Sequence, residues 1–117
     1  MNDRELLELA AKAAGYGELI FRDGAGDDGY DNGIWTYTWR RDESKKLIDW
    51  NPLTNDGDAL RLAVKLGIGT EVWKGQAWAW KDGAKNEPIA IEELGDDPYV
   101  ATRRAIVCAA AEIGRMK

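Results

Sequence analysis

Tryptophan and arginine are the residue types whose positions in this chain suggest a binding site. The 117 residues include six tryptophans, and a tryptophan is difficult to bury completely because its indole N–H needs a hydrogen-bond partner. Trp35, Tyr37 and Trp39 alternate along one stretch, and Trp78 and Trp80 alternate along another. Alternation along a strand places these rings on one face, where they either fill a core or form a platform on which a flat ring stacks.

Arginines lie near both features. A helical projection of the last segment puts Arg103 within an apolar face, and that face is formed by Tyr99, Ile106, Val107, Ala110 and Ile113. A buried guanidinium group pairs with a carboxylate, extends to the rim, or binds an anionic ligand, and the sequence leaves these options open. Arg104 flanks the same face, and Arg40 ends the first aromatic stretch. If the arginines converge on the tryptophans, the site fits a nucleotide-like ligand, with stacked rings and phosphates held by guanidinium groups.

The usual catalytic and metal-binding sets are missing from the composition. The chain has no histidine and a single cysteine, Cys108, which excludes an intrachain disulfide, His-dependent triads and the common zinc sites. An enzyme would therefore depend on carboxylates such as Asp49, Asp56 or Glu71, or on a lysine with a lowered pKa, and no spacing marks such an arrangement. We predict no catalytic residue, metal or cofactor.

Charge and hydropathy limit the class of partner. The formal net charge is −5, which argues against binding to bulk nucleic acid or to an anionic membrane surface. No apolar run is long enough to span a bilayer, and the first residues are acidic and amphipathic rather than a signal peptide. With 44% hydrophobic and 32% charged residues, we expect a cytosolic protein with a single domain over residues 1–117.

The first half of the chain is predicted to contain a helix and three strands. Asn2 and Glu5 have the spacing of a capping box before a helix over residues 3–14, which Gly15 ends. A short strand is expected over residues 18–22, followed by an acidic, glycine-rich loop over residues 23–33. Residues 33–41 alternate with period two, and residues 46–50 return as the second arm of a hairpin.

The central stretch, residues 50–67, combines an aromatic residue, a proline turn and a capped helix. Asn55 or Asp56 is expected to cap this helix. Its predicted buried arc contains Ala59, Leu60, Leu62, Ala63, Val64 and Leu66, and the opposite side holds Asp58, Arg61 and Lys65. Trp50 and Asn51, at the start of the stretch, are the part that we place near a site.

The second half is predicted to alternate strand and helix again. Residues 70–81 form a strand region of one strand or of two segments kinked at Gly75, and residues 88–94 form a short strand. Asp97 with Pro98 begins a terminal helix that runs to about Gly114. The expected fold class is α+β, a single-domain α/β/α sandwich with three helices and a mainly antiparallel or mixed sheet.

Three stretches of the sequence resemble the phage ABA-sandwich domain family of small tailed-phage and prophage proteins. They are MNDRELLELAAKAAG, WNPLTNDGDALRLAVKLG and RRAIVCAAAEIG. The resemblance covers the first helix, the central stretch and the last helix. It implies a sheet packed between helices, a phage origin, and the cytoplasm of the infected bacterial host. It carries over no catalytic residue.

Two hypotheses of function follow. The first is a non-catalytic phage protein that binds a small anionic aromatic ligand, such as a nucleotide-like signal of host defence. Its ligand-binding residues would be Trp35, Tyr37, Trp39, Arg40, Trp50, Asn51, Trp78, Trp80, Arg103 and Arg104. The alternative is a protein-interaction or structural phage module, in which the aromatic face is core or an interface with a host or phage protein. Exposed edge strands also favour a homodimer or a higher homo-oligomer.

Overall fold

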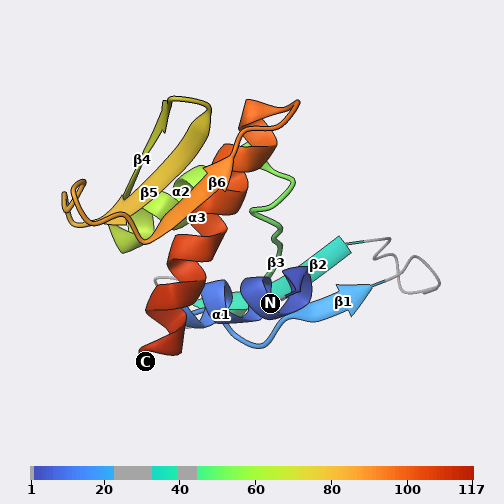
Figure 1. The fold of residues 1–117 in the computed structure, drawn as a ribbon. Coiled ribbons are helices and arrows are strands. Elements are labelled where there is room, and N and C mark those ends of the chain that lie inside the picture. The colour runs from blue at the N-terminus through green and yellow to red at the C-terminus, as the bar shows by residue number, and fades with distance from the viewer. Residues whose placement is uncertain (1, 23–32, 40–44) are drawn as a thin grey trace.

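The computed structural model describes residues 2–22, 33–39 and 45–117, with the backbone alone for residues 22, 37–39 and 45 (Figure 1). The elements in chain order are α1 (Asp3–Ala14), β1 (Ile20–Arg22), β2 (Gly33–Trp39), β3 (Lys45–Asp49), α2 (Asp56–Leu66), β4 (Ile68–Trp73), β5 (Gln76–Lys81), β6 (Ala90–Glu93) and α3 (Pro98–Arg115). The expected α+β class with three helices is confirmed. The predicted acidic loop, residues 23–33, lies outside the described residues except for Gly33.

The capping signals in the sequence begin the helices at the expected residues. The side chain of Asn2 accepts a hydrogen bond from the amide of Glu5 at the start of α1, and Asn55 does the same for Asp58 at the start of α2. Asp97 caps α3, with Pro98 in the first turn. These bonds satisfy amides that have no partner within their own helix, so short polar side chains fix where each helix starts.

Helices α1 and α3 cross at close range because small residues line their contact. Ala10 and Ala109 are fully buried there. A Cβ atom added to Gly114 would collide with the backbone carbonyl of Leu9. Only glycine fits at this crossing, so the close spacing of the two helix backbones depends on Gly114.

The strands form two antiparallel sheets with three strands each, which we call sheet A (β1-β2-β3) and sheet B (β4-β5-β6). The strand region over residues 70–81 is divided near Gly75, but by a turn and not by a kink: Lys74 and Gly75, both with positive φ, form the tight turn of a hairpin in which Trp73 pairs with Gln76. A two-residue turn of this kind matches the twist of the paired strands. The strand region predicted for residues 70–81, expected in two segments, is therefore the hairpin of β4 and β5 in sheet B.

The two faces of sheet B differ. Register places Ile68, Ala77, Ala79 and Ala90 on one face, and all four are buried under α3 and α2, which pack on this side. We call it the inner face. The other face, which we call the outer face, carries the tryptophans of β4 and β5. The alanines let α3 approach the sheet closely, because they add little thickness between the two layers.

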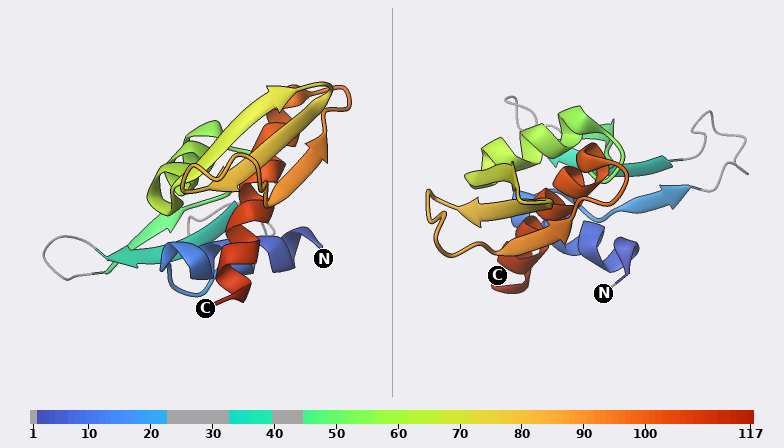
Figure 2. Two further views of the ribbon diagram at one scale, coloured as in Figure 1. Left: turned by 60° about the vertical axis from the view of Figure 1, so that its left-hand side comes forward. Right: turned by 45° about the horizontal axis from the view of Figure 1, so that its top comes forward.

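Sheet A packs through β2 and the residues that follow β3. Thr36 is fully buried, and its hydroxyl donates a hydrogen bond of 2.8 Å to the carbonyl of Gly17. Ile34 and Ile48 pack against the main core, and the amide of Trp50 donates to the carbonyl of Ile34. Figures 1 and 2 show sheet A beside α1, apart from sheet B, and α3 crossing α1 below the sheet on which it packs.

Helix α2 departs from the predicted pattern in three places. Leu60 and Val64, expected in the buried arc, are 64% and 73% exposed, whereas Asp58, expected toward solvent, is only 8% exposed. Asp58 is buried because it accepts hydrogen bonds from the backbone amide of Asn51 and from Arg61. These bonds rotate the buried side of α2 toward the 50–55 segment and leave Leu60 and Val64 at the surface.

In the described part of the chain, no helix has the length and apolar character needed to cross a bilayer.

Candidate functional site

Trp50, which sequence analysis placed near a site, belongs to the core. It is 2% exposed, and the ring of Tyr16 meets it edge to face with centroids 5.4 Å apart. The backbone amide of Asn51, the next residue, donates a hydrogen bond to the side chain of Asp58. The side-chain oxygen of Asn51 accepts a hydrogen bond from the amide of Leu53. These contacts shape the turn before α2. We call Trp50, Asn51, Asp58 and Arg103 the inner junction.

Arg103 completes the inner junction from α3. Its Nε donates a hydrogen bond of 2.9 Å to the carbonyl of Leu53, and its Nη1 lies 2.6 Å from Oδ1 of Asp56. The side chain of Arg103 is 16% exposed. Of the options that the sequence left open, the structure shows the internal ion pair. Tyr99, expected on the same buried face, is instead 68% exposed.

Arg104 is also paired within the chain. Its Nη1 lies 2.8 Å from Oδ1 of Asp3, and its Nε lies 3.9 Å from Oε1 of Glu92. The hydrogen bond to Asp3 raises the pKa of Arg104. Cys108 contacts the same carboxylate of Glu92 at 3.4 Å, and burial, followed by the charge of Glu92, raises the pKa of its thiol to about 11. This thiol is therefore protonated at neutral pH and poorly nucleophilic.

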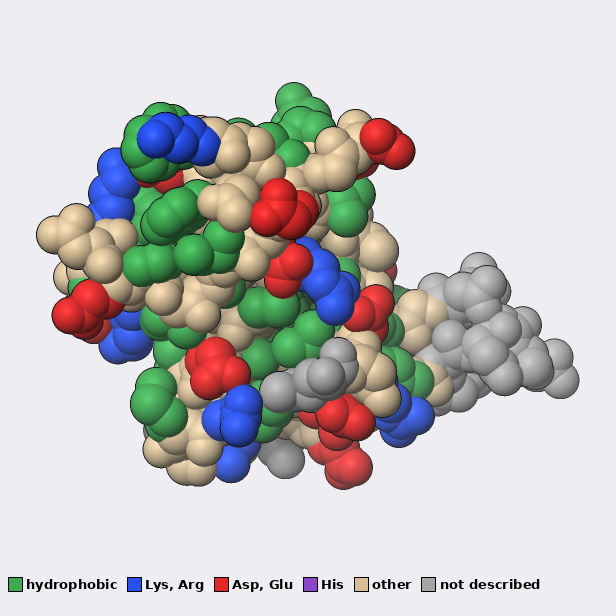
Figure 3. Space-filling model, viewed as in Figure 1, with side chains coloured by type: hydrophobic (Ala, Val, Ile, Leu, Met, Phe, Trp, Pro, Cys, Tyr) green, Lys and Arg blue, Asp and Glu red, His purple; other side chains and the backbone are tan. Residues whose placement is uncertain are grey.

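The outer face of sheet B gathers the exposed aromatic residues. Register aligns Trp73 with Gln76, Glu71 with Trp78, and Trp78 with Ile91. Trp73 is 54% exposed and Ile91 is 46% exposed; the rings of Trp73 and Trp78 lie with centroids 6.5 Å apart and planes tilted by 60°. Hydrophobic side chains gather over sheet B in Figure 3. No described helix covers this face, because α2 and α3 both pack on the inner one.

Trp80 lies flat on the outer face because its cross-strand neighbour is glycine. Gly69 pairs with Trp80 in register, and a Cβ atom at Gly69 would overlap the indole ring. Lys85 stands beside the same ring, with its Nζ 5.7 Å from the ring centroid and 2.8 Å from Oε2 of Glu71. In the described part of the chain, the buried Nε1 of Trp78 has no hydrogen-bond partner. An unpaired indole N–H beside exposed rings is the kind of group that a bound partner can satisfy after a small shift.

The aromatic residues of β2 lie on the other sheet. Trp35 is partly buried and pairs in register with Ile20 and Asp49. Tyr37 and Trp39 continue the backbone of β2, but their side chains, and the whole of Arg40, lie outside the described residues. Trp35 and the sheet B tryptophans thus belong to sheets that stand apart in Figures 1 and 2.

Sheet B separates the predicted arginines from the tryptophans of β5. Glu92, which faces Arg104, pairs in register with the buried Ala77 and so lies on the inner face. Arg103 lines a hollow together with Thr70, whose register partner is the buried Ala79. Both arginines are therefore on the inner side of the sheet, whereas Trp78 and Trp80 are on the outer side. The structure does not bring these four residues together.

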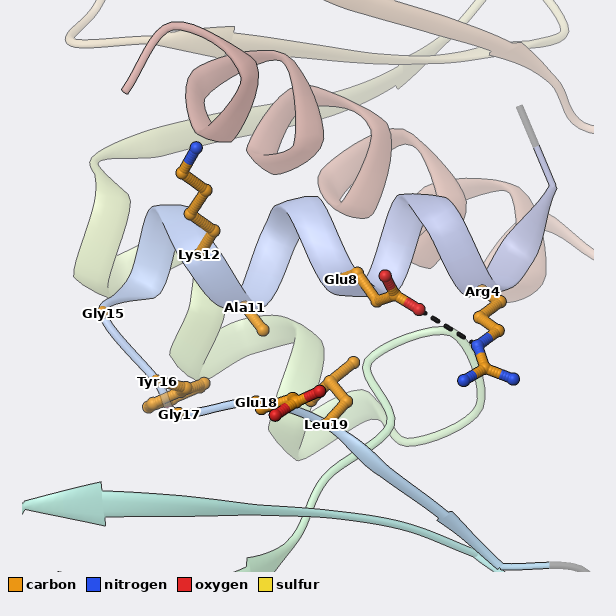
Figure 4. A pocket seen from close by; sticks show the side chains of 9 residues that line it. All are labelled: Arg4, Glu8, Ala11, Lys12, Gly15, Tyr16, Gly17, Glu18 and Leu19. Atoms are coloured by element: carbon orange, nitrogen blue, oxygen red, sulfur yellow. Dashed lines mark hydrogen bonds and ion pairs between the residues drawn. The ribbon is translucent and has the colours of Figure 1, made fainter.

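A second hollow, of about 490 Å³, lies between α1 and the segment that leads into β1 (Figure 4). Its two cationic side chains are occupied. Arg4 pairs with Glu8 at 3.0 Å and lies 4.3 Å over the ring of Phe21. Lys12 points away from this pair in Figure 4 and donates to the carbonyl of Lys117. Burial, then the charge of Asp58, raises the pKa of Tyr16, so its hydroxyl stays neutral near pH 7. Among the described residues that line it, the hollow offers no unpaired cation to an anionic ligand.

The carboxylates named for a hypothetical enzyme lie on three different elements. Asp49 ends β3, Asp56 begins α2, and Glu71 lies on β4. Asp56 pairs with Arg103 and Glu71 with Lys85. Within the described residues, no group of three or more cysteine or acidic side chains is placed to hold a metal ion.

Sequence reasoning missed Trp73 and Lys74 as site residues. Trp73 is one of the six tryptophans, but a kink at Gly75 does not predict that Trp73 pairs with Gln76 of β5. The signal was present, because a glycine preceded by a residue that accepts positive φ and flanked by alternating aromatics favours a hairpin. That hairpin places Trp73 beside Trp78 and Lys74 at the corner, with the Nζ of Lys74 4.4 Å over the ring of Trp73.

No protein-family model, curated protein or solved structure matches this chain.

Proposed function

We propose that the chain is a non-catalytic protein-interaction module, and that its docking surface is the outer face of sheet B. The observation that carries this proposal is the gathering of Trp73, Trp78, Trp80 and Ile91 on one uncovered face, with Trp73 and Ile91 about half exposed. Exposed tryptophan in a cluster is the residue type that most often dominates the binding energy of an interface. The paired arginines contribute to folding rather than to this surface.

The size of the face points to a short segment as its partner. Three strands spaced by about 4.8 Å and six residues of about 3.3 Å each give a face of about 300 Å². A standard interface between two globular proteins buries about 800 Å² on each side. The outer face alone is too small for such an interface, whereas it suits a peptide or a loop that presents a few anchoring side chains. The predicted homo-oligomer remains a prediction.

A display experiment tests the interaction function. Random peptides of about twelve residues are selected on the immobilised protein, and the affinities of enriched peptides are measured for Trp73→Ala and for Met116→Lys. Met116 is an exposed hydrophobic residue at the end of α3, so its variant controls for surface changes elsewhere. We expect Trp73→Ala to weaken binding about tenfold or more and Met116→Lys to leave it unchanged. Enrichment that is equal on Trp73→Ala protein contradicts the proposal.

A flat anionic ligand is the second candidate, and the pair of rings at the hairpin favours it. Trp73 and Trp78 offer two tilted ring faces. Among the described residues, Lys74 has no carboxylate partner, and its ammonium group lies over the Trp73 ring. In this version of the hypothesis, Lys74 binds the phosphate, a role that the sequence analysis gave to Arg103 and Arg104. Titration with a panel of linear and cyclic nucleotides, followed by tryptophan fluorescence, tests it. Nucleotide binding must weaken in Lys74→Ala. If no nucleotide of the panel changes the tryptophan fluorescence, this candidate function is excluded.

The setting of either function is part of the proposal. The resemblance of residues 1–15, 50–67 and 103–114 to a phage family supports a phage-encoded protein that acts in the cytoplasm of the infected bacterial host. If the chain is an interaction module, its partner there is a host or phage protein. If it binds a flat anionic ligand, it sequesters a nucleotide-like signal of host defence. Neither role requires catalysis, a metal or a cofactor.

A further inference from the structure

We infer that the free edge of β4, with the apolar hollow beside it, accepts an extended peptide segment that carries apolar side chains at alternate positions and adds a fourth strand to sheet B. This inference rests on the proposed interaction function, because it specifies which kind of partner the module takes and how that partner lies. The argument depends on the direction of the backbone groups of β4, on the exposure of its edge, and on the hollow.

The hydrogen-bonding pattern leaves Thr70 and Val72 open. The amide of Asp82 donates to the carbonyl of Gly67 at 2.9 Å, and the register of β4 with β5 continues from this pair. Because bonded and non-bonded pairs alternate in an antiparallel ladder, residues 69, 71 and 73 point their backbone groups at β5. Thr70 and Val72 therefore point theirs away from β5. Neither has a backbone partner on that side within the described residues, and β4 is the edge of its sheet.

The edge of β4 lacks the protection found at the other sheet edges. Val72 is 49% exposed, and Thr70 is exposed. Proteins usually guard an edge by keeping the strand short or by placing lysine on it: β1 has three residues, β6 has four, and β3 begins with two lysines. Strand β4 has six residues, and its one charged side chain, Glu71, is paired with Lys85. It is the described edge best suited to strand addition.

A hollow of about 330 Å³ adjoins this edge on the inner side of the sheet. Leu60 of α2, Thr70 of β4, and Tyr99 and Ile106 of α3 line it, and Leu60 and Tyr99 are 64% and 68% exposed at its rim. Arg103 and Asp56 also reach the hollow, but they are paired with each other, so the described lining of the hollow presents no unpaired charge. An added strand points alternate side chains to opposite faces. One set would enter the hollow, and the other would meet Trp73 on the outer face.

A second copy of the chain fits this edge less well than a linear peptide. In the register that pairs Thr70 with Val72 of the second copy, the two Glu71 side chains lie directly opposite each other, which is unfavourable. The open strip is about 20 Å long and about 10 Å wide, or roughly 200 Å², which is far below the 800 Å² or so per partner of a stable dimer. A peptide gains affinity from main-chain hydrogen bonds instead of from area. These points favour an extended apolar segment of a partner protein.

Hydrogen exchange followed by NMR tests the inference directly. The probe is a capped synthetic peptide of about seven residues, with leucine or valine at alternate positions and threonine between them. Its controls are a scrambled peptide and a peptide with alternate amides N-methylated. We expect saturating peptide to slow the exchange of the Thr70 and Val72 amides by about tenfold or more. The Glu71 amide, which points at β5, should change little, and the N-methylated peptide should not bind.

Two variants give the same test by affinity. Thr70→Lys adds a lysine to the edge, and Leu60→Lys places a charge at the rim of the hollow, so each should weaken peptide binding about tenfold or more. Both positions are exposed, so both variants should fold. Met116→Lys, with the same kind of change far from sheet B, should bind the peptide as the parent chain does.

The outcomes separate this inference from the proposed function. If peptides bind and Trp73→Ala abolishes binding while the Thr70 and Val72 amides exchange as before, the outer face alone is the site; the inference fails and the function stands. If no alternating peptide binds, the inference also fails, and the display experiment still decides the function. If the Thr70 and Val72 amides are already protected in the free protein and this protection falls on dilution, a second copy occupies the edge, which overturns the peptide as its occupant.

Discussion

The inner junction and the outer face of sheet B use similar residues in opposite ways. In the inner junction, Trp50 is 2% exposed against Tyr16, and Arg103 binds both a carbonyl and a carboxylate. On the outer face, Trp73 is 54% exposed. There the Nε1 of Trp78 has no hydrogen-bond partner among the described residues. The first region buries its tryptophan and pairs its arginine within the chain, whereas the second leaves a tryptophan half exposed.

This difference assigns a role to each region. A tryptophan or an arginine whose polar groups are all paired internally contributes to the free energy of folding, because removing it leaves a cavity or an unpaired partner. A tryptophan left half exposed contributes little to folding and keeps its apolar surface available for a partner. Substitutions should therefore divide into those that lower stability and those that lower binding.

The largest effect on stability is expected for Trp50→Ala. Removing this buried ring should lower the free energy of unfolding by about 3–5 kcal/mol, since it leaves a cavity beside Tyr16 in the core. The matched variant Trp73→Ala removes the same side chain from the surface and should cost less than about 1 kcal/mol. Urea denaturation of the two variants measures the contrast. Equal losses would break the distinction between the two regions.

Arg103→Ala should have the next largest effect. It removes hydrogen bonds to Leu53 and Asp56 and leaves a partly buried carbonyl without its donor, so we expect a loss of about 1.5–3 kcal/mol. Arg115→Ala, which removes an ion pair whose arginine side chain is 54% exposed, serves as the control and should change stability by less than about 1 kcal/mol. If Arg103→Ala keeps full stability but loses a ligand, Arg103 belongs to the binding site and not to the inner junction.

Gly69→Ala changes the outer face of sheet B instead of the inner junction. The added methyl group overlaps the ring of Trp80, so the ring must leave its place on the outer face. We expect a cost of about 1 kcal/mol, at the low end for overpacking, because a side chain rather than the backbone moves. Binding of display-selected peptides should fall together with a shift in tryptophan fluorescence. An unchanged emission spectrum would show that Trp80 does not rest on Gly69.

The smallest effect concerns alkaline pH and is confined to the inner side of sheet B. The pKa of Cys108 is raised from 9.0 to about 11 in the folded chain, so the folded state favours the neutral thiol. Its contribution to stability is fully present below pH 9 and is lost as pH rises through about 11. Urea midpoints at alkaline pH should therefore fall less in Cys108→Ala than in the parent chain. Tyr16, whose pKa is also raised, acts in the same direction in both proteins. Parallel midpoints in the two proteins would contradict the assignment.

Local signals in the sequence were sufficient for the elements. The caps at Asn2, Asn55 and Asp97, and the order of helices and strands, follow from short-range chemistry that each segment carries by itself. The period-two alternation also separated Trp78 and Trp80 from Ala77 and Ala79, as the structure confirms.

Long-range pairing could not be predicted from the same signals. The partner of Arg103 lies 47 residues away at Asp56, and no local pattern distinguishes that carboxylate from the others. Asp58 was expected toward solvent, because a charged residue in a helix is usually exposed; its burial depends on the amide of Asn51, which arrives from outside the helix. The separation of Trp35 from Trp78 likewise depends on the division into two sheets, which alternation within one strand does not show.

The affinity of a display-selected peptide for Trp73→Ala, measured by calorimetry beside the parent chain, tests the central claim most directly. The outer face of sheet B is the binding surface and the inner junction supports the fold, so this variant should bind about tenfold more weakly or worse while its urea midpoint stays close to that of the parent. Unchanged affinity in Trp73→Ala would contradict the account, because the most exposed ring of the proposed surface would then contribute nothing to binding.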